Sequence, residues 1–196
     1  MKKFLFLSIF ILVNLVLRVY LSINDVPKGD ILVHRDWSNI LFQQGLSGSY
    51  FFEGWTYTPP TQPPLMMSCF YFSEYIYQNR NFFSQLHNTI KLPPSFILLG
   101  FQKYGQILTL RLWETLFTYF IALIFFFYFS KKISFLKSLV IFNLIIFSPI
   151  SLFTNSIWGQ NDILPTAFMY LGFLTIFSNF ILLSPLFFIT GILFKP

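Results

Sequence analysis

Long apolar runs separated by polar stretches organise this chain of 196 residues. The runs are Phe4–Leu21, Ile107–Phe129, about Ile133–Phe153, about Ile163–Phe177 and about Phe180–Phe194. A helix needs about 20 residues to cross a bilayer, so the last two runs are short for a span. The pattern predicts an all-α polytopic membrane protein with about five spanning helices. We expect one membrane domain over residues 1–196, with a first span at 4–21, an outer loop at 22–106 and further spans at 107–194.

The first run also resembles a secretory signal peptide, because Lys2 and Lys3 precede it. However, it is long enough to span, Arg18 interrupts its far end, and no small-x-small cleavage site follows. We therefore expect an anchor helix here.

The composition excludes several classes of protein. A mean hydropathy of +0.65, with 10% charged residues, fits neither a soluble domain nor a disordered chain. The net charge of +6 does not indicate nucleic-acid binding, because the basic residues lie singly or in short clusters beside apolar runs. Cys69 is the single cysteine, and the two histidines, His34 and His87, lack metal-site spacing, so no cysteine or histidine metal site is expected.

Lysines beside the spans predict the orientation, since cytoplasmic loops are enriched in Lys and Arg. The inner side then holds the N-terminus and the turn after the second span, with Lys2, Lys3, Lys131, Lys132 and Lys137. The outer side holds residues 22–106 and 156–162. Most carboxylates share that side: Asp25, Asp30, Asp36, Glu53, Glu74 and Asp162. Charged residues are costly in lipid, so this gathering predicts one working face.

Two apolar pieces of the outer loop, Leu65–Tyr77 and Pro94–Phe101, are too short to span. Their aromatic residues and prolines favour helices lying at the membrane interface, with a re-entrant pair as the alternative. Gln78–Leu92, between them, is interpreted as a solvated connector. Glu53 and Glu74 are expected to be surface residues.

The stretch from Gly29 to Trp37 carries the first candidate chemistry. Asp30, His34 and Trp37 recur at helical spacing, so one helix face would present a carboxylate, an imidazole and an indole. Asp30 is alternatively an N-cap, and His34 a surface histidine. Arg35 is alternatively a partner for Asp36.

Two further patterns lie on the outer side. In Trp55–Leu65, two Pro-Pro pairs enforce an extended backbone, while Trp55 and Tyr57 offer rings that sit at headgroup level or stack on a sugar. A rigid turn is the alternative. The polar residues of Ser156–Asp162 exceed what a short connector needs, although a helix start at Asp162 also explains some of them.

Together these patterns resemble the N-terminal part of GT-C membrane glycosyltransferases, in particular bacterial mannosyltransferase-like proteins. The resemblance rests on Asp30 with Trp37 after the first span, Tyr57-Thr58-Pro59-Pro60 or Pro63-Pro64-Leu65, Arg111, Trp158-Gly159-Gln160-Asn161-Asp162 and Lys195-Pro196. It implies an integral protein of the bacterial inner membrane with an extracytoplasmic active face. Its partners would be a polyprenyl-phosphate sugar donor and a glycan, lipid or protein acceptor.

The resemblance also implies roles for individual residues. Asp30 would be the general base of an inverting transfer, with Asp36 as second choice. Arg111 would hold donor phosphate, unless it only pairs with Glu114. The other expected substrate-binding residues are His34, Arg35, Trp37, Tyr57, Trp158, Gln160 and Asp162. Asp30 and Asp36 also offer oxygen ligands that would suit a divalent cation such as Mg²⁺ or Mn²⁺.

Other classes of function stay open. Members of the superfamily are longer than this chain, so an inactive or truncated glycosyltransferase is one alternative. A transporter or flippase would place its polar residues near the bilayer midplane instead of at one face. An assembly subunit would need none of the three patterns.

Overall fold

The computed structural model describes residues 2–24 and 30–195, and within them the chain is helical without strands. Asp25, Gly29 and Pro196, which the sequence patterns include, lie outside these residues. The predicted all-α fold class is therefore confirmed for the described part of the chain.

In the described part of the chain, three helical segments are long and apolar enough to cross a membrane: Leu5–Asn24, Leu112–Ser130 and Phe135–Trp158. They correspond to α1 (Lys2–Asn24), α6 (Leu112–Ser130), and α7 (Phe135–Ile146) with α8 (Pro149–Ser151) and the π-helical η1 (Leu152–Trp158). Two shorter apolar helical segments follow, α9 (Ile163–Phe177) and η2 (Ile181–Leu183) with α10 (Ser184–Phe194). Many apolar side chains of these long and short segments are exposed: the exposed fraction is 69% for Leu136 and 95% for Leu182. A surface this apolar is suited to lipid.

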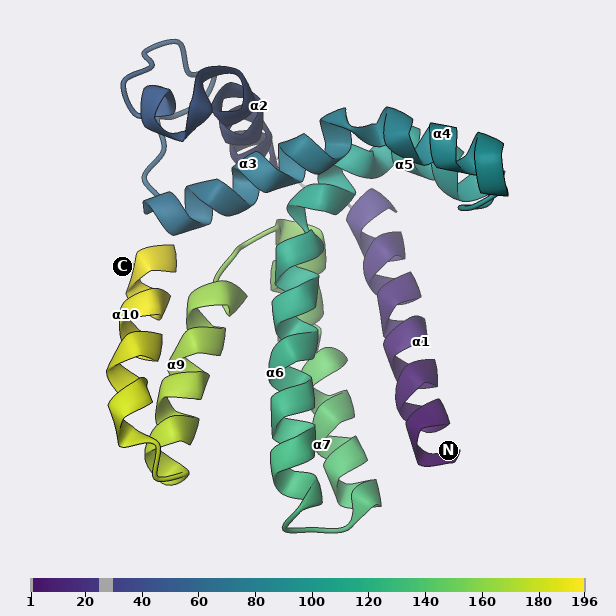
Figure 1. Ribbon diagram of the computed structural model, residues 1–196, viewed down its shortest axis with the longest axis vertical. Coiled ribbons are helices and arrows are strands. Elements are labelled where there is room, and N and C mark those ends of the chain that lie inside the picture. The colour runs from purple at the N-terminus through teal and green to yellow at the C-terminus, as the bar shows by residue number, and fades with distance from the viewer. Residues whose placement is uncertain (1, 25–29, 196) are drawn as a thin grey trace.

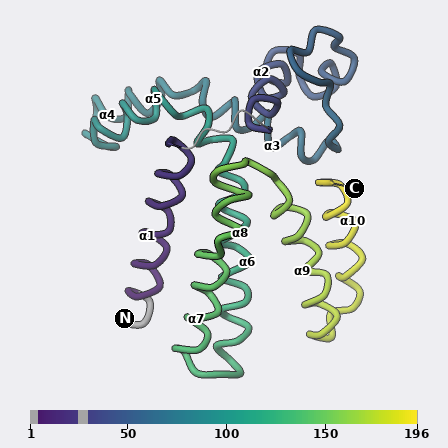
Figure 2. Tube along the Cα trace, turned by 180° about the vertical axis from the view of Figure 1, so that it is seen from behind, coloured from purple at the N-terminus to yellow at the C-terminus, as the bar shows by residue number. Residues whose placement is uncertain are grey.

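The polar part of the chain forms a layer across one end of these helices (Figure 1). The layer consists of α2 (Asp30–Ser49), α3 (Pro64–Gln78), α4 (Arg80–Ile90) and α5 (Ser95–Leu110). The beginning of α1 and the α6–α7 turn, which contains Lys131 and Lys132, lie at the opposite end (Figure 2). The lysine-bearing turn and the carboxylate-bearing layer are thus separated by the length of the apolar helices.

The outer loop is more helical than its sequence predicts. The piece Leu65–Tyr77 is α3, but Pro94–Phe101 continues into α5, which reaches Leu110. The second apolar run is therefore divided at Arg111, and α6 starts at Leu112. The interpretation of Gln78–Leu92 as a connector was wrong, because most of this stretch forms the helix α4. Its exposure was expected correctly, since no residue of α4 is buried.

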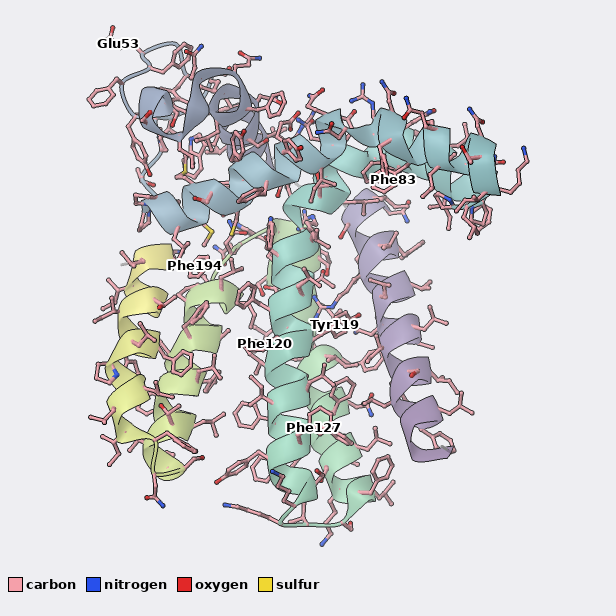
Figure 3. All side chains as sticks on the ribbon, viewed as in Figure 1. Glu53, Phe83, Tyr119, Phe120, Phe127 and Phe194 are labelled. Atoms are coloured by element: carbon pink, nitrogen blue, oxygen red, sulfur yellow. The ribbon has the colours of Figure 1, made fainter. Side chains whose placement is uncertain are left out.

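The two glutamates of the outer layer differ sharply. Glu53 is exposed and points away from the layer (Figure 3). Glu74 was wrongly expected at the surface, because only 1% of it is exposed. Its carboxylate accepts hydrogen bonds from Ser38, Gln78 and Gln106. These donors come from α2, α3 and α5, so Glu74 joins three helices of the layer at one point.

Arg18, which interrupts the first apolar run, is buried at 2% exposure. Its guanidinium donates to the side chain of Asn14, the carbonyl oxygen of Ile146 and the hydroxyl of Ser151. A buried charge needs such partners in a low-dielectric surrounding. Arg18 therefore fastens α1 to the segment from α7 to η1.

Two apolar clusters stabilise this arrangement. One, in the membrane-spanning part, joins α1, α6 and α7 through Leu7, Ala122, Phe126, Leu139, Phe142 and Ile146. The other includes Trp37 and Phe70 of the outer layer, Leu164 of α9 and Phe194 of α10. Because this second cluster packs the layer onto the ends of α9 and α10, it sets the position of the candidate site.

Candidate functional site

A polar pocket of about 240 Å³ lies where α2 meets the proline-rich segment Trp55–Leu65, the start of α9 and the end of α10. We call it the α2 pocket. Its lining residues are Asp30, Val33, His34, Trp37, Thr58, Thr61, Gln62, Gln160, Asn161 and Lys195. The structure thus brings four of the predicted site residues to one pocket: Asp30, His34, Trp37 and Gln160.

Asp30 is the first residue of α2, and its carboxylate reaches a second predicted residue. Trp158 donates a hydrogen bond from Nε1 to Oδ2 of Asp30, at 2.8 Å. The indole comes from the end of η1, 128 positions along the chain. The first and third sequence patterns therefore meet at one carboxylate.

His34 and Trp37 follow Asp30 along the same face of α2, as their spacing predicts. The His34 ring stacks on Phe70, with 4.6 Å between centroids. Trp37 donates from Nε1 to the carbonyl oxygen of Thr58 at 2.7 Å, which ties the proline-rich segment to α2. Both rings are therefore fixed beside the pocket.

The imidazole of His34 is held in its neutral form. Burial lowers its pKa to about 4; the nearby Asp30 charge opposes this, and the charges of Arg111 and Lys195 reinforce it. At neutral pH the ring therefore offers one hydrogen-bond donor and one acceptor, and carries no positive charge.

Asp36 lies apart from the α2 pocket and has a different environment. Its carboxylate accepts hydrogen bonds from Thr56, both from the backbone N–H and from the hydroxyl, each at 2.8 Å. The backbone N–H of Tyr57 also donates to it, at 3.4 Å. Asp36 therefore fixes the backbone that precedes the first Pro-Pro pair, and Tyr57 itself is 55% exposed.

Arg35 also points away from the α2 pocket. Its Nε donates to Oε1 of Gln106 at 3.0 Å. Through Gln106 it joins the group of polar residues around Glu74. This contact, and not an ion pair with Asp36, occupies the guanidinium among the described residues.

Arg111 supports the end of η1, which carries Trp158. Its Nη1 donates to the carbonyl oxygen of Asn155 and its Nη2 to that of Ile157, both at 2.7 Å. Gly159 follows with a left-handed φ of 85°, and a Cβ there would lie 3.2 Å from Nη1 of Arg111. Arg111 forms no ion pair with Glu114 in the described part of the chain, and it does not line the α2 pocket.

Asp162 forms an ion pair with Lys195 beside the α2 pocket. Lys195 lines that pocket, whereas Asp162 lines a second, mainly apolar groove of about 810 Å³. This groove runs between α6, the segment from α7 to η1, and α9. The ion pair therefore stands between a polar pocket and an apolar groove.

Sequence reasoning missed several lining residues. They are Val33, Thr58, Thr61, Gln62 and Asn161, and Lys195 was noticed only as part of a Lys-Pro pair. The position of hydrogen-bonding side chains between the two Pro-Pro pairs was a usable signal, because a rigid extended backbone presents such side chains at fixed points.

The carboxylates do not form a shared cation site. Asp30 faces Trp158 in the α2 pocket, while both oxygens of Asp36 accept hydrogen bonds from Thr56. Among residues 2–24 and 30–195, no group of three or more His, Cys, Asp and Glu residues is placed to hold a metal ion. The donor set therefore does not fit a cation bound jointly by Asp30 and Asp36.

The chain matches no protein-family model, no curated protein and no solved structure. The chemistry and geometry of the α2 pocket therefore carry the functional assignment.

Proposed function

We propose that this protein is a GT-C type membrane glycosyltransferase, which transfers a hexosyl group such as mannose from a polyprenyl-phosphate sugar to an extracytoplasmic acceptor. The observation that carries the proposal is the Asp30 carboxylate, which is oriented by Trp158 in a polar pocket that also contains Lys195. A base and a cation in one pocket are what transfer from a sugar phosphate requires.

Asp30 acts as the general base. It removes the proton of the acceptor hydroxyl as that oxygen attacks the anomeric carbon of the sugar. The bond from this carbon to the phosphate oxygen breaks, and polyprenyl phosphate leaves with the bonding electrons, which inverts the anomeric configuration. The Trp158 indole occupies Oδ2, so Oδ1 is the oxygen that takes the proton.

Lys195 supplies the positive charge that the leaving phosphate needs. It lines the α2 pocket and is 42% exposed at its side chain, so an anionic group can reach it. Its ion pair with Asp162 would be exchanged for contact with the phosphate. No general acid is required, because phosphate is already a good leaving group.

The remaining lining residues suit a sugar, which presents several hydroxyl groups. Gln160 and Asn161 offer amides, and neutral His34 offers a donor and an acceptor. Gln62 lines the pocket with a buried Oε1 that has no hydrogen-bond partner among the described residues. A ligand hydroxyl would satisfy this acceptor.

The neighbouring apolar groove supports a lipid-linked donor. It begins at Asp162, on the other side of the ion pair from the α2 pocket, and continues along α6 to Phe129. A polyprenyl chain lying in this groove would leave its phosphate near Lys195. The lipid and sugar parts of one donor would thus occupy the two adjoining cavities.

The end of the molecule that bears the α2 pocket would face the extracytoplasmic side of the bacterial inner membrane. The α6–α7 turn, with Lys131 and Lys132, lies at the opposite end of the apolar helices (Figure 1). Such lysines mark the cytoplasmic side of spanning segments.

The proposal is tested by transfer of labelled sugar in proteoliposomes that contain polyprenyl-phosphate mannose or glucose, with an extract of cell-envelope glycans and lipids as acceptors. Replacement Asp30→Asn keeps the size of the side chain and removes the base, so transfer should fall by about 10²- to 10⁴-fold. Asp36→Asn is the matched control, because it changes a carboxylate outside the pocket. Full transfer by the Asp30→Asn protein, or none by the unaltered protein with either donor, would contradict the proposal.

A further inference from the structure

The hairpin of α4 and α5, residues 80–110, projects sideways from the outer layer, past the end of α1 (Figure 1). We call it the α4–α5 arm. Both views show it lying across the direction of the spanning helices, not along it (Figure 2). Its position is therefore level with the end of a span, where a bilayer meets water.

The arm exposes more apolar surface than contact with water would favour. Its exposed large apolar side chains are Phe82, Ile90, Leu92, Phe96, Ile97 and Leu99. Exposed apolar side chains gathered on one hairpin indicate a surface that contacts a membrane or a protein.

One side of the arm faces the spans. Phe83 of α4 packs against Phe101 of α5, with 5.5 Å between ring centroids. The two rings line a small, mainly apolar hollow together with Leu15 and Val19 of α1. Phe83 lies on the side of the arm toward the apolar helices (Figure 3). An apolar side of the arm therefore faces the interior of the bilayer.

The charges of the arm are all positive. Arg80, Lys91 and Lys103 belong to it, and no Asp or Glu occurs between Tyr75 and Trp113. Within residues 2–24 and 30–195, none of the three cations forms an ion pair. Their charge is therefore available to an external anion.

Aromatic rings and the hairpin turn hold these cations in place. The Arg80 guanidinium lies 4.6 Å from the Tyr77 ring centroid, and the Lys103 ammonium lies 4.9 Å from that of Tyr104. Lys91 ends α4 with a left-handed φ of 59°, a position where glycine is more usual. The turn therefore carries a cation at the tip of the arm.

We propose that the α4–α5 arm lies on the bilayer surface and binds anionic phospholipid headgroups through Arg80, Lys91 and Lys103. The apolar side enters the headgroup region, and the cations meet the lipid phosphates beside it. Each basic residue near an anionic surface contributes a factor of about five to affinity, so the three together contribute about 100-fold. This inference is independent of the sugar-transfer reaction.

Local lipid composition around the arm tests the proposal. The full chain with Asn88→Cys is labelled on α4 with a fluorophore and placed in nanodiscs of phosphatidylcholine. Cys69 does not compete for the label, because it is buried and burial raises the pKa of its thiol to about 12. Nitroxide-labelled phosphatidylglycerol should then quench the fluorophore at a lower lipid fraction than nitroxide-labelled phosphatidylcholine.

Two further measurements identify the cause of that preference. The triple variant Arg80→Gln, Lys91→Gln and Lys103→Gln should lose it by about 100-fold. A control variant changes the net charge equally at the opposite end of the spans. It combines Lys131→Gln, Lys132→Gln and Lys137→Gln, and it should retain the preference for phosphatidylglycerol. High salt should also weaken the preference of the labelled protein that keeps all three cations, and this measurement needs no replacement of a cation.

Equal quenching by the two lipids would overturn the proposal. So would a preference that survives both the triple arm variant and high salt, or one that the control variant loses to the same extent.

Discussion

Trp158 donates its indole hydrogen to the Asp30 carboxylate across 2.8 Å, which joins the end of η1 to the beginning of α2. The contact orients the proposed base from outside its own helix. The arrangement therefore depends on the position of η1 as much as on that of α2.

Replacement Trp158→Phe keeps a ring at this position but removes the donor to Asp30. A hydrogen bond to a charged group contributes about 1.5–3 kcal/mol, and exposure to solvent places this one at the lower end. We therefore expect the rate of sugar transfer to fall by about 10-fold, with little change in KM for the donor. Phe153→Leu is the control, because Phe153 contacts the Trp158 ring and its side chain has no hydrogen-bond donor for Asp30. An unchanged rate in the Trp158 variant would refute an orienting role.

Replacement Gly159→Ala should strain the loop that follows η1. The left-handed φ of 85° disfavours alanine, and its Cβ would press on the Arg111 guanidinium at 3.2 Å. We expect a loss of about 1–3 kcal/mol in the free energy of unfolding, measured by denaturation in detergent micelles. Gly100→Ala provides the matched comparison, since a Cβ at this helical position meets nothing within 4 Å. Equal stabilities of the two variants would show that the loop tolerates the strain.

Replacement Glu74→Ala should destabilise the outer layer. It removes the buried acceptor of the Gln78 and Gln106 amides, which costs about 3 kcal/mol, while the Ser38 hydroxyl keeps its hydrogen bond to the carbonyl oxygen of Arg35. The melting temperature of the purified protein measures this loss. Glu53→Ala removes an equal charge from an exposed position and should leave the melting temperature unchanged. A similar response of both variants would mean that the hydrogen bonds of Glu74 contribute little.

The buried histidine predicts how stability depends on pH. Since burial lowers the pKa of His34 from 6.5 to about 4, the unfolded chain takes up a proton at a higher pH than the folded protein does. The contribution of His34 is therefore complete above about pH 6.5 and is lost as the pH falls toward 4, by about 3 kcal/mol in total.

Unfolding titrations at pH 7 and near pH 4 measure this loss. His34→Gln removes the titrating group and should reduce the difference in stability between the two pH values by about 3 kcal/mol. His87→Gln, which leaves His34 intact, is the matched control for loss of a histidine. If His34→Gln shows the pH dependence of the unaltered protein, other groups are responsible for it.

Local periodicity was enough to predict part of the site. Asp30, His34 and Trp37 are separated by about one helical turn, and side chains at this spacing share a face wherever the helix lies. The apolar runs predicted the helical character for a similar reason, because their length and composition act within one segment. The break at Arg111 was missed, since an apolar run on both sides of a cation resembles one continuous helix.

The two carboxylates of α2 show where this kind of reasoning ends. Asp30 and Asp36 are both acidic and both near the start of the same helix, and only the resemblance ranked Asp30 ahead of Asp36 as the base. Their environments come from distant segments: Trp158 donates to Asp30, whereas Thr56 donates to Asp36. The same is true of Glu74, whose burial depends on α5 packing against α3.

The amino-acid sequence predicts that the long apolar segments are helical and suited to lipid, and which side chains share a face of α2, because these properties depend on neighbours along the chain. Packing between distant segments brings Trp158 to Asp30 and Arg111 to the carbonyl oxygens of η1. It also forms the ion pair between Asp162 and Lys195. Such contacts depend on how whole helices lie against one another, which no local pattern of residues contains.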